Sequence, residues 1–270
     1  MVTGLGARFD SIVESVGPLC IGIDPSSVTL GAVGIADTAD GALEFGRVIT
    51  SAAASRVGIV KPQVAYFERF GSFGIAALET VIREAREAGL AVIADAKRGD
   101  IGTTMQGYAD AWLGDGPLRS DALTVSPYQG FDALEPAFSR AASIGSTVFV
   151  LCATSNPDAK DLQRASLAGS SVSAIVARYA KERSGATNTV GVVVGATRDV
   201  AEAGLSADDL AGLIVLAPGF GAQGASLTDI RRIFGTATPR VIPSVSRSVI
   251  RSGLAGVATS IDEHLRELGL

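Results

Sequence analysis

The sequence predicts an α/β protein with one domain, residues 1–270, folded as an eight-stranded parallel (β/α)8 barrel. Three observations support this prediction. Short, β-branched and nearly uncharged segments recur along the chain, helix-like patterns lie between them, and no linker or low-complexity tract interrupts the series. The hydrophobicity of these segments is continuous rather than alternating. That pattern is typical of strands buried on both faces, as in a parallel sheet covered by helices.

Eight segments are expected to form the barrel strands. In chain order they are residues 19–24, 57–61, 91–96, 122–126, 147–153, 189–195, 213–217 and 240–245. The expected helices include residues 75–88, 105–113, 132–142, 172–183, 228–234 and 248–268. A doubly wound sheet is the alternative fold. The number and even spacing of the units disfavour it, and no glycine fingerprint for a dinucleotide follows the first strand.

The composition excludes several classes of function. The net charge is −5, which argues against a nucleic-acid partner because polyanion binding normally needs a basic patch. A single histidine, His264, cannot build a multi-histidine metal site. Because it lies in the last expected helix beside charged residues, we expect His264 to be a surface residue rather than a catalyst.

The cysteines and the apolar stretches indicate where the protein resides. Cys20 and Cys152 are too few for a disulfide framework, suit a reducing compartment and are expected to be small core residues. Residues 1–16 contain three charged side chains and lack the apolar run of a signal peptide. The uncharged stretches 141–157 and 211–228 are too interrupted to span a membrane. We therefore expect a cytoplasmic protein without membrane contact.

Charged residues follow three successive expected strands. Asp24 ends the first, Lys61 ends the second, and the third ends in a cluster that contains Asp95, Lys97 and Asp100. Chemistry in (β/α)8 barrels gathers at the carboxyl ends of the strands. One charge at a strand end is often only solvated, but charges at three neighbouring ends predict an active site.

The spacing within the third cluster predicts a contact between two of its members. Asp95 and Lys97 are two residues apart, so their side chains share one face of the strand and are expected to point into the barrel mouth. A nearby carboxylate favours a charged lysine, which suits proton donation better than Schiff-base chemistry. The alternative interpretation is a buried pair that only fixes the loop.

The loops after the seventh and eighth expected strands predict a phosphate site. Barrels commonly bind phosphate there. The first loop supplies Gly219, Gly221 and Gly224, which permit close approach of the backbone, together with Gln223. The second supplies Arg247, a fixed bidentate donor that matches phosphate oxygens. The glycines alone would be explained equally well as turns.

These residues also form a familiar series of motifs. Asp95-x-Lys97-x-x-Asp100, followed by Ile101-Gly102-Thr103-Thr104, resembles the signature of the orotidine 5′-phosphate decarboxylase family. The resemblance covers nearly the whole chain. Its other motifs are Gly22-Ile23-Asp24-Pro25, Val60-Lys61-Pro62-Gln63, Leu151-Cys152-Ala153-Thr154-Ser155-Asn156-Pro157, Ala217-Pro218-Gly219-Phe220-Gly221-Ala222-Gln223-Gly224 and Ser244-Val245-Ser246-Arg247-Ser248. Two segments, Val60-Lys61-Pro62-Gln63 and Val192-Val193-Val194-Gly195-Ala196-Thr197, resemble the longer bacterial branch of that family.

The resemblance implies a reaction and the residues that perform it. The family converts orotidine 5′-monophosphate to UMP and CO2 in pyrimidine biosynthesis, without metal or organic cofactor. By this resemblance Lys97 stabilises and protonates the carbanion at C6, and Asp95 lies near the departing carboxylate. Asp100 and Thr104 correspond to residues that reach the ribose and the charge network across a homodimer interface.

The remaining expected contacts also follow from the resemblance. Asp24 corresponds to a ribose-binding residue, Lys61 to a member of the charge network, and Ser155 to the residue that reads the pyrimidine edge. Pro218, Gln223 and Arg247 belong to the expected substrate-binding set. Many family members have glycine directly before the phosphate arginine, whereas this chain has Ser246, whose Cβ slightly restricts the approach of the backbone to a phosphate.

Two other functions compete with this one. Sugar-phosphate enzymes such as 3-keto-L-gulonate 6-phosphate decarboxylase and hexulose-6-phosphate synthase share the Asp-x-Lys-x-x-Asp motif. They hold Mg²⁺ with its first aspartate and an acidic residue at the end of the second strand. Lys61 occupies that second position here, and a cation there opposes metal binding. A catalytically silent phosphate- or nucleotide-binding barrel is the second alternative, although binding alone does not require such a charge cluster.

Overall fold

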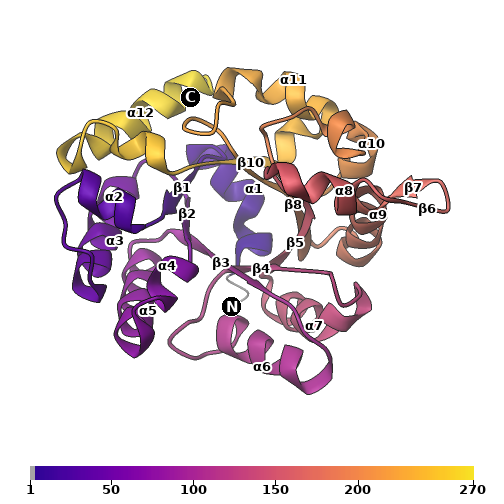
Figure 1. Ribbon diagram of the computed structural model, residues 1–270, viewed down its shortest axis with the longest axis horizontal. Helices are drawn as coiled ribbons and strands as arrows, with labels where there is room; N and C mark the ends of the chain where they lie inside the picture. The colour runs from indigo at the N-terminus through magenta and orange to yellow at the C-terminus, as the bar shows by residue number, and fades with distance from the viewer. Residues whose placement is uncertain (1–3) are drawn as a thin grey trace.

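In the computed structural model, which describes residues 4–270, eight parallel strands close into a barrel (Figure 1). The strands, in their order around the barrel, are β1 (Cys20–Ile23), β2 (Ile59–Pro62), β3 (Ala91–Arg98), β4 (Ala122–Val125), β5 (Thr147–Ala153), β8 (Val190–Val194), β9 (Val215–Pro218) and β10 (Val241–Val245), which pairs back with β1. Each of the eight expected strand segments contains one of these strands or overlaps it. The (β/α)8 class is therefore confirmed.

Helices surround the barrel and connect its strands (Figure 1). They are α1 (Leu5–Val16), α2 (Ser27–Ala32), α3 (Ala39–Ala53), α4 (Ala65–Glu68), α5 (Gly71–Glu87), α6 (Gly102–Leu113), α7 (Glu135–Ile144), α8 (Lys160–Gln163), α9 (Val172–Ser184), α10 (Ala207–Leu210), α11 (Ile230–Phe234) and α12 (Val257–Glu267). The sequence encodes several of their ends. The hydroxyls of Ser26, Thr38 and Ser171 accept hydrogen bonds from the first turns of α2, α3 and α9.

The last expected helix is shorter than predicted. Residues 248–268 were expected to be helical throughout, but the α-helix begins only at Val257. The preceding residues form two 3-10 turns, Arg247–Ile250 and Leu254–Gly256. The interruption lies at Gly253, which has a φ of 74°, a left-handed conformation that ends helical structure and favours glycine.

His264 is buried, and the expectation of a surface residue is wrong. Its side chain lies on the face of α12 that packs on the 3-10 turn Arg247–Ile250, and the residue is only 3% exposed. Its Nε2 lies 2.9 Å from the Oγ of Ser248. The charged residues next to His264 in the sequence suggested exposure. However, adjacent residues of a helix point in different directions, so a buried side chain can have charged neighbours in the sequence that face solvent.

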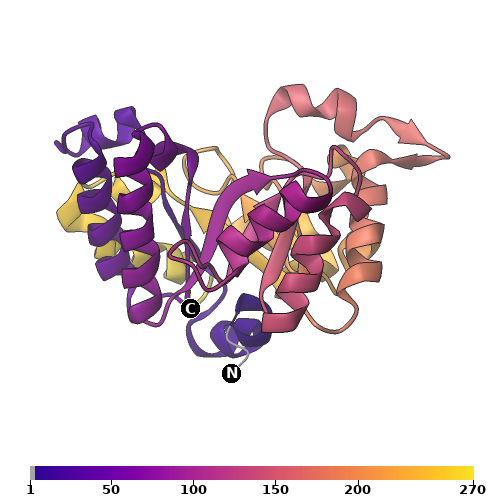
Figure 2. The ribbon, with the colours of Figure 1, turned by 90° about the horizontal axis from the view of Figure 1, so that it is seen from below.

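A tightly packed interior fills the barrel, and α1 closes its amino-terminal end. Leu5, Phe9 and Ile12 of α1 join one buried cluster with the inward-facing residues of the strands, among them Phe149. Figure 2 shows α1 beneath the barrel, at the end opposite the small hairpin of β6 (Ser166–Leu167) and β7 (Ser170–Ser171). Cys20 and Cys152 are buried and unpaired, as expected for core residues.

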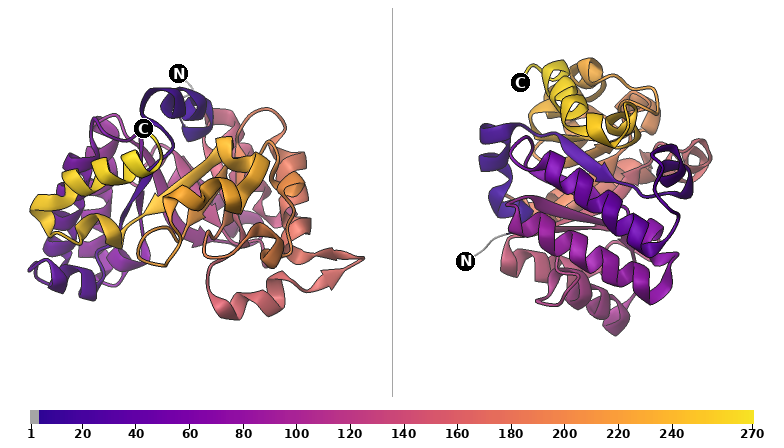
Figure 3. Two further views of the ribbon diagram at one scale, coloured as in Figure 1. Left: turned by 90° about the horizontal axis from the view of Figure 1, so that it is seen from above. Right: turned by 90° about the vertical axis from the view of Figure 1, so that its left-hand side faces the viewer.

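The other end of the barrel carries the longer loops. Several of the segments that follow the strands contain short helices there, and the β6–β7 hairpin projects furthest from the barrel (Figure 3). Within residues 4–270, none of the helices is long and apolar enough to cross a membrane. The carboxyl ends of the strands therefore meet at an end whose surface is built by loops and short helices.

Replacing Phe9 with alanine should lower the free energy of unfolding by about 3–5 kcal/mol, because a large side chain is removed from the closed end of the core. Phe9 is 1% exposed, and the guanidinium of Arg240 lies 5.1 Å from its ring centroid. Urea unfolding measures the loss. Leu167→Ala, at a side chain that is 66% exposed, is the control and should change stability by less than about 0.5 kcal/mol. Equal effects of the two variants would contradict the role given to α1.

Candidate active site

A cavity of about 520 Å³ opens at the carboxyl ends of the barrel strands. It brings together side chains from the carboxyl ends of β2, β3, β4 and β9 and from the segments that follow β1, β5 and β9, which are distant in the sequence. Seven of the residues predicted from the sequence line it: Asp24, Lys61, Asp95, Lys97, Ser155, Pro218 and Gln223. Four of the strand-end charges, Asp24, Lys61, Asp95 and Lys97, therefore lie at one cavity.

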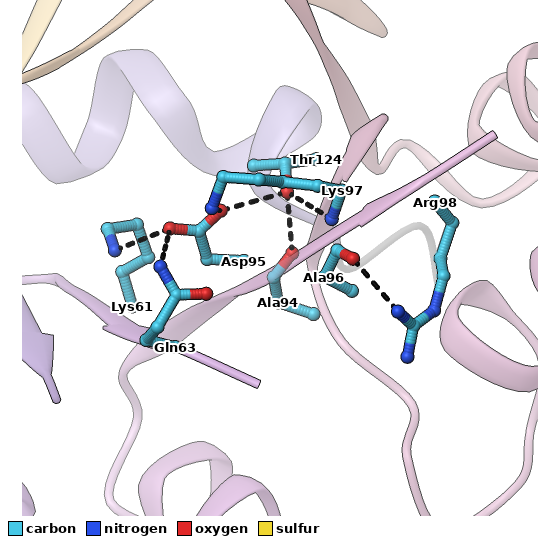
Figure 4. A network of polar contacts seen from close by, with 8 residues as sticks. All are labelled: Lys61, Gln63, Ala94, Asp95, Ala96, Lys97, Arg98 and Thr124. Atoms are coloured by element: carbon cyan, nitrogen blue, oxygen red, sulfur yellow. Dashed lines mark hydrogen bonds and ion pairs between the residues drawn. The ribbon is translucent and has the colours of Figure 1, made fainter. Parts of the chain in front are cut away.

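The carboxylate of Asp95 is the centre of this site (Figure 4). Its Oδ1 accepts hydrogen bonds from Lys97 Nζ at 2.5 Å and from Thr124 Oγ1 at 3.0 Å. Its Oδ2 accepts hydrogen bonds from Lys61 Nζ and Gln63 Nε2, both at 2.9 Å. Each oxygen therefore accepts one hydrogen bond from an ammonium group and one from a neutral donor. Such charge-assisted bonds are the strongest that side chains make.

The charges in this network stabilise one another against burial. Burial alone would raise the pKa of Asp95, but the positive charges of Lys61 and Lys97 and their hydrogen bonds outweigh it and hold that pKa well below its usual range. For Lys61, burial would lower the pKa, but the negative charges of Asp95 and Asp24 reverse the effect and raise it. The cluster thus holds an ionised carboxylate and a charged lysine where isolated charges would be costly.

Lys97 differs from Lys61 in exposure and in backbone conformation. The side chain of Lys97 is 44% exposed, whereas that of Lys61 is 8% exposed. The φ angle of Lys97 is 49°, which is rare for a residue with a long side chain and costs of the order of 1–3 kcal/mol. This strain occurs where β3 and β4 change register, between Ala94 and Arg98. The chain thus departs from ideal strand geometry at the residue whose ammonium contacts both Asp95 and the cavity.

Asp24 presents an unsatisfied acceptor at the same cavity. Its Oδ1 is buried and has no hydrogen-bond partner among residues 4–270. Buried polar atoms are normally hydrogen-bonded, so this oxygen has room for a donor that the described residues do not supply.

Two residues of the network were missed in the sequence. Gln63 appears only within the motif that contains Lys61, and Thr124 lies in the apolar segment that forms β4. Both donate to Asp95. A signal was available for Thr124, because a hydroxyl in an otherwise apolar strand must find a hydrogen-bond partner inside the protein.

Three predicted residues lie outside the main cavity. Asp100 and Thr104 do not line it. The Oδ1 of Asp100 accepts a hydrogen bond from the backbone N–H of Ile101 at 2.8 Å, and Thr104 is exposed on α6. Within one chain, therefore, no contact joins Asp100 to the pair formed by Asp95 and Lys97.

Arg247 lines a neighbouring cavity of about 450 Å³, together with Gly221, Gly224 and Ser248. Gly221 has a φ of 71°, and a Cβ there would lie 2.6 Å from the Ser248 hydroxyl, so both its conformation and its surroundings require glycine. The guanidinium of Arg247 has no acidic partner within residues 4–270. The structure thus places the predicted glycine loop beside the guanidinium of Arg247. The same loop also borders the main cavity, because its Gln223 lines that cavity.

Ser246, the departure from the family pattern, is accommodated by a glycine on β1. A Cβ added to Gly22 would lie 2.7 Å from the Cβ of Ser246. The small residue on β1 therefore leaves room for the side chain that precedes Arg247.

A metal site of the kind used by the sugar-phosphate enzymes lacks one of its two acidic ligands here, because Lys61 stands at the end of the second strand. Among residues 4–270, no group of three or more histidine, cysteine or acidic side chains is placed to hold a metal ion. The Nζ of Lys61 lies 2.9 Å from Asp95, where a second acidic ligand would be needed. The ammonium and a divalent cation would repel each other at this distance.

The comparisons with known proteins agree with one another. Residues 17–260 match the model of the orotidine 5′-phosphate decarboxylase / HUMPS family. The chain is 46% identical to the orotidine 5′-phosphate decarboxylase of Streptomyces coelicolor, over 97% of this chain and 96% of that protein. It is 47% identical to the enzyme of the same name from Salinispora arenicola, over 92% and 90%. A crystal structure from Streptomyces avermitilis, described as a candidate orotidine 5′-phosphate decarboxylase, superposes with a TM-score of 0.91 at 42% identity, over 98% and 95% of the chains.

Replacing Asp95 with asparagine should lower the free energy of unfolding at neutral pH by about 3–5 kcal/mol, because Lys61 is left buried without its main counter-charge. The double variant Asp95→Asn/Lys61→Met should regain much of this loss, since no buried charge then remains unpaired. Urea unfolding of the three proteins measures both effects. A double variant that is less stable than Asp95→Asn alone would contradict the assignment.

The difference between wild type and Asp95→Asn should also depend on pH. Since folding lowers the pKa of Asp95, its ionised form contributes stability above the ordinary carboxyl pKa of about 4. That contribution is lost progressively as the pH falls below about 4 toward the lowered pKa. Unfolding curves at a series of pH values should show a constant difference between pH 5 and 8 and a shrinking one below about pH 4.

Proposed function

The chain belongs to the orotidine 5′-phosphate decarboxylase / HUMPS family, and we propose that it is the carboxy-lyase that converts orotidine 5′-monophosphate to UMP and CO2 in pyrimidine biosynthesis. The observation that carries this proposal is the ionised Asp95 held between Lys61 and Lys97 at the cavity wall. A site of preorganised charge suits a reaction in which a full negative charge develops on one carbon.

The proposed chemistry uses only side chains. The bond between C6 and the carboxylate breaks, CO2 leaves, and the electron pair stays on C6, in an orbital that the ring π system cannot delocalise. The ammonium of Lys97 stabilises this charge and then donates its proton to C6. Solvent returns a proton to Lys97, which reaches it because the side chain is 44% exposed. Asp95 holds the ammonium in place and lies near the departing carboxylate.

The other predicted residues bind the substrate in this proposal. Asp24, at the cavity wall, accepts a hydrogen bond from a ribose hydroxyl with its carboxylate. Ser155 reads the pyrimidine edge. Gln223 and Arg247 bind the phosphate beside the glycine loop, and Pro218 forms part of the wall between base and phosphate. Lys61 lines the same cavity and serves by holding Asp95 in place and ionised.

We also propose that two chains form a homodimer in which Asp100 and Thr104 complete the partner's site. The face that would be covered carries large exposed apolar side chains. Phe73, Ile101 and Tyr128 are 79%, 60% and 81% exposed and follow β2, β3 and β4, at the same end of the barrel as the cavity. Large apolar side chains exposed after three neighbouring strands are consistent with an interface at this end of the barrel. The proposal further includes a single domain, a cytoplasmic location and no nucleic-acid partner.

The purified protein should lower the ultraviolet absorbance of orotidine 5′-monophosphate as UMP forms, and excess EDTA should leave the rate unchanged. Activity that appears only with added Mg²⁺ would favour the sugar-phosphate enzymes of the same family instead. If the protein acts neither on orotidine 5′-monophosphate nor on sugar phosphates, it would instead be a phosphate- or nucleotide-binding barrel without catalytic activity.

Lys97→Ala should lower kcat by at least about a thousandfold, because both the charge that stabilises C6 and the proton donor are removed. Lys181→Ala is the matched control, since Lys181 is exposed and its Nζ donates only to the carbonyl of Asp208. It should retain full activity. Thermal unfolding of both variants verifies that they fold, and a fully active Lys97→Ala would contradict the mechanism.

Mixed dimers test whether Asp100 acts across the interface. Lys97→Ala and Asp100→Ala should each be inactive alone. Refolded together in equal amounts, they should recover about a quarter of wild-type activity, because half of the dimers are mixed and each mixed dimer has one intact site. Lys97→Ala mixed with Lys97→Arg is the control and should recover nothing. Absence of recovery in the first mixture would mean that Asp100 serves its own chain.

A further inference from the structure

We propose that Thr124 is a positioning residue, whose hydroxyl sets both the backbone of Lys97 and the carboxylate of Asp95. Thr124 lies on β4, is 1% exposed and borders the cavity. Figure 4 shows its hydroxyl between the two residues. The inference rests on the proposed function, in which Lys97 reaches the reacting carbon, and adds what holds Lys97 there.

The first contact concerns the irregular end of β3. The parallel register of β3 and β4 runs from Ala94 paired with Leu123 to Arg98 paired with Val125, so β3 has more residues than β4 across this stretch. Such a bulge interrupts the backbone ladder. The backbone N–H of Lys97, at a φ of 49°, donates instead to the Oγ1 of Thr124 at 2.9 Å. The hydroxyl therefore replaces a ladder hydrogen bond in the left-handed stretch.

The second contact uses the hydroxyl proton. Thr124 Oγ1 lies 3.0 Å from Asp95 Oδ1 and 3.5 Å from the carbonyl oxygen of Ala94, so its single proton is better placed for the carboxylate. The same Oδ1 accepts the bond from Lys97 Nζ. One hydroxyl thus accepts from the backbone of Lys97 and donates to the oxygen that holds the Lys97 ammonium. The two ends of this lysine are fixed through a single atom.

This arrangement matters because few other contacts fix Lys97. Its side chain is 44% exposed, so its position depends on hydrogen bonds. Displacement of a catalytic group by about 1 Å can lower a rate about a hundredfold. Loss of the Thr124 hydroxyl would remove two hydrogen bonds together, the one from the backbone N–H of Lys97 and the one to Oδ1 of Asp95. It would leave Arg247 and the residues expected to bind the base and phosphate untouched.

Thr124→Val, which keeps the shape of the side chain but removes the hydroxyl, should lower kcat about a hundredfold while KM and UMP binding stay within about threefold of wild type. Thr124→Ser, which keeps the hydroxyl, should restore kcat to within about fivefold of wild type. Thr147→Val is the matched control. Thr147 is a fully buried threonine of β5 whose hydroxyl donates to the carbonyl of Asn188 at 2.9 Å, and its loss should lower the melting temperature without lowering kcat.

The outcomes separate this inference from the proposed function. An inactive wild-type protein would refute the decarboxylase proposal, and with it the inference. With an active wild type, a Thr124→Val kcat within threefold of wild type, or a Thr124→Ser kcat as low as that of Thr124→Val, would overturn the role of the hydroxyl. If Thr124→Val does not fold, the kcat of Thr124→Ala relative to Thr124→Ser decides by the same criteria.

Discussion

The candidate site depends on one buried carboxylate. Asp95 can remain ionised away from water only if both its oxygens are well supplied with donors, because an isolated buried charge costs several kcal/mol. Its four donors come from β2, β3 and β4 and the residue just after β2. The carboxylate is therefore fixed to three neighbouring strands. The barrel strands, rather than a loop, therefore determine the position of any group that is bound to this carboxylate.

The barrel interior explains why these strands hold the site. Along each of the three, the inward face changes from apolar to polar within two residues, since alternate residues share a face. The pairs are Ile59 and Lys61, Ile93 and Asp95, and Ala122 and Thr124. The first member of each pair is packed in the barrel core and the second lines the cavity. The packed layer thus forms a floor for the charged layer, and the closed core limits how far the strands can shift.

The sequence predicted what depends on strand patterning and missed what depends on packing between elements. Continuous apolar runs located all eight strands, and the two-residue spacing correctly predicted the contact between Asp95 and Lys97. The hydroxyl of Thr124 in an apolar strand could indicate a buried hydrogen bond, but its bond to the backbone of Lys97 could not be predicted, because it arises from a register shift between β3 and β4. His264 was misjudged for a similar reason, since its burial depends on how α12 packs on the turn that contains Ser248. The placement of Asp100 away from Asp95 likewise follows from the loop path, which periodicity does not encode.

The network also distinguishes its two lysines. Both contact Asp95, one on each carboxylate oxygen, so charge and distance alone do not assign the proton donor of the proposed mechanism. The difference in burial favours Lys97. Lys61 is 8% exposed and its pKa is raised, so it holds its proton and its role is to keep Asp95 ionised. Lys97 is 44% exposed, so a ligand in the cavity and water can both reach its ammonium. In the proposed mechanism the proton given to C6 must be replaced in every turnover. Lys97, with its access to solvent, can take up that proton while Lys61 keeps the carboxylate in place.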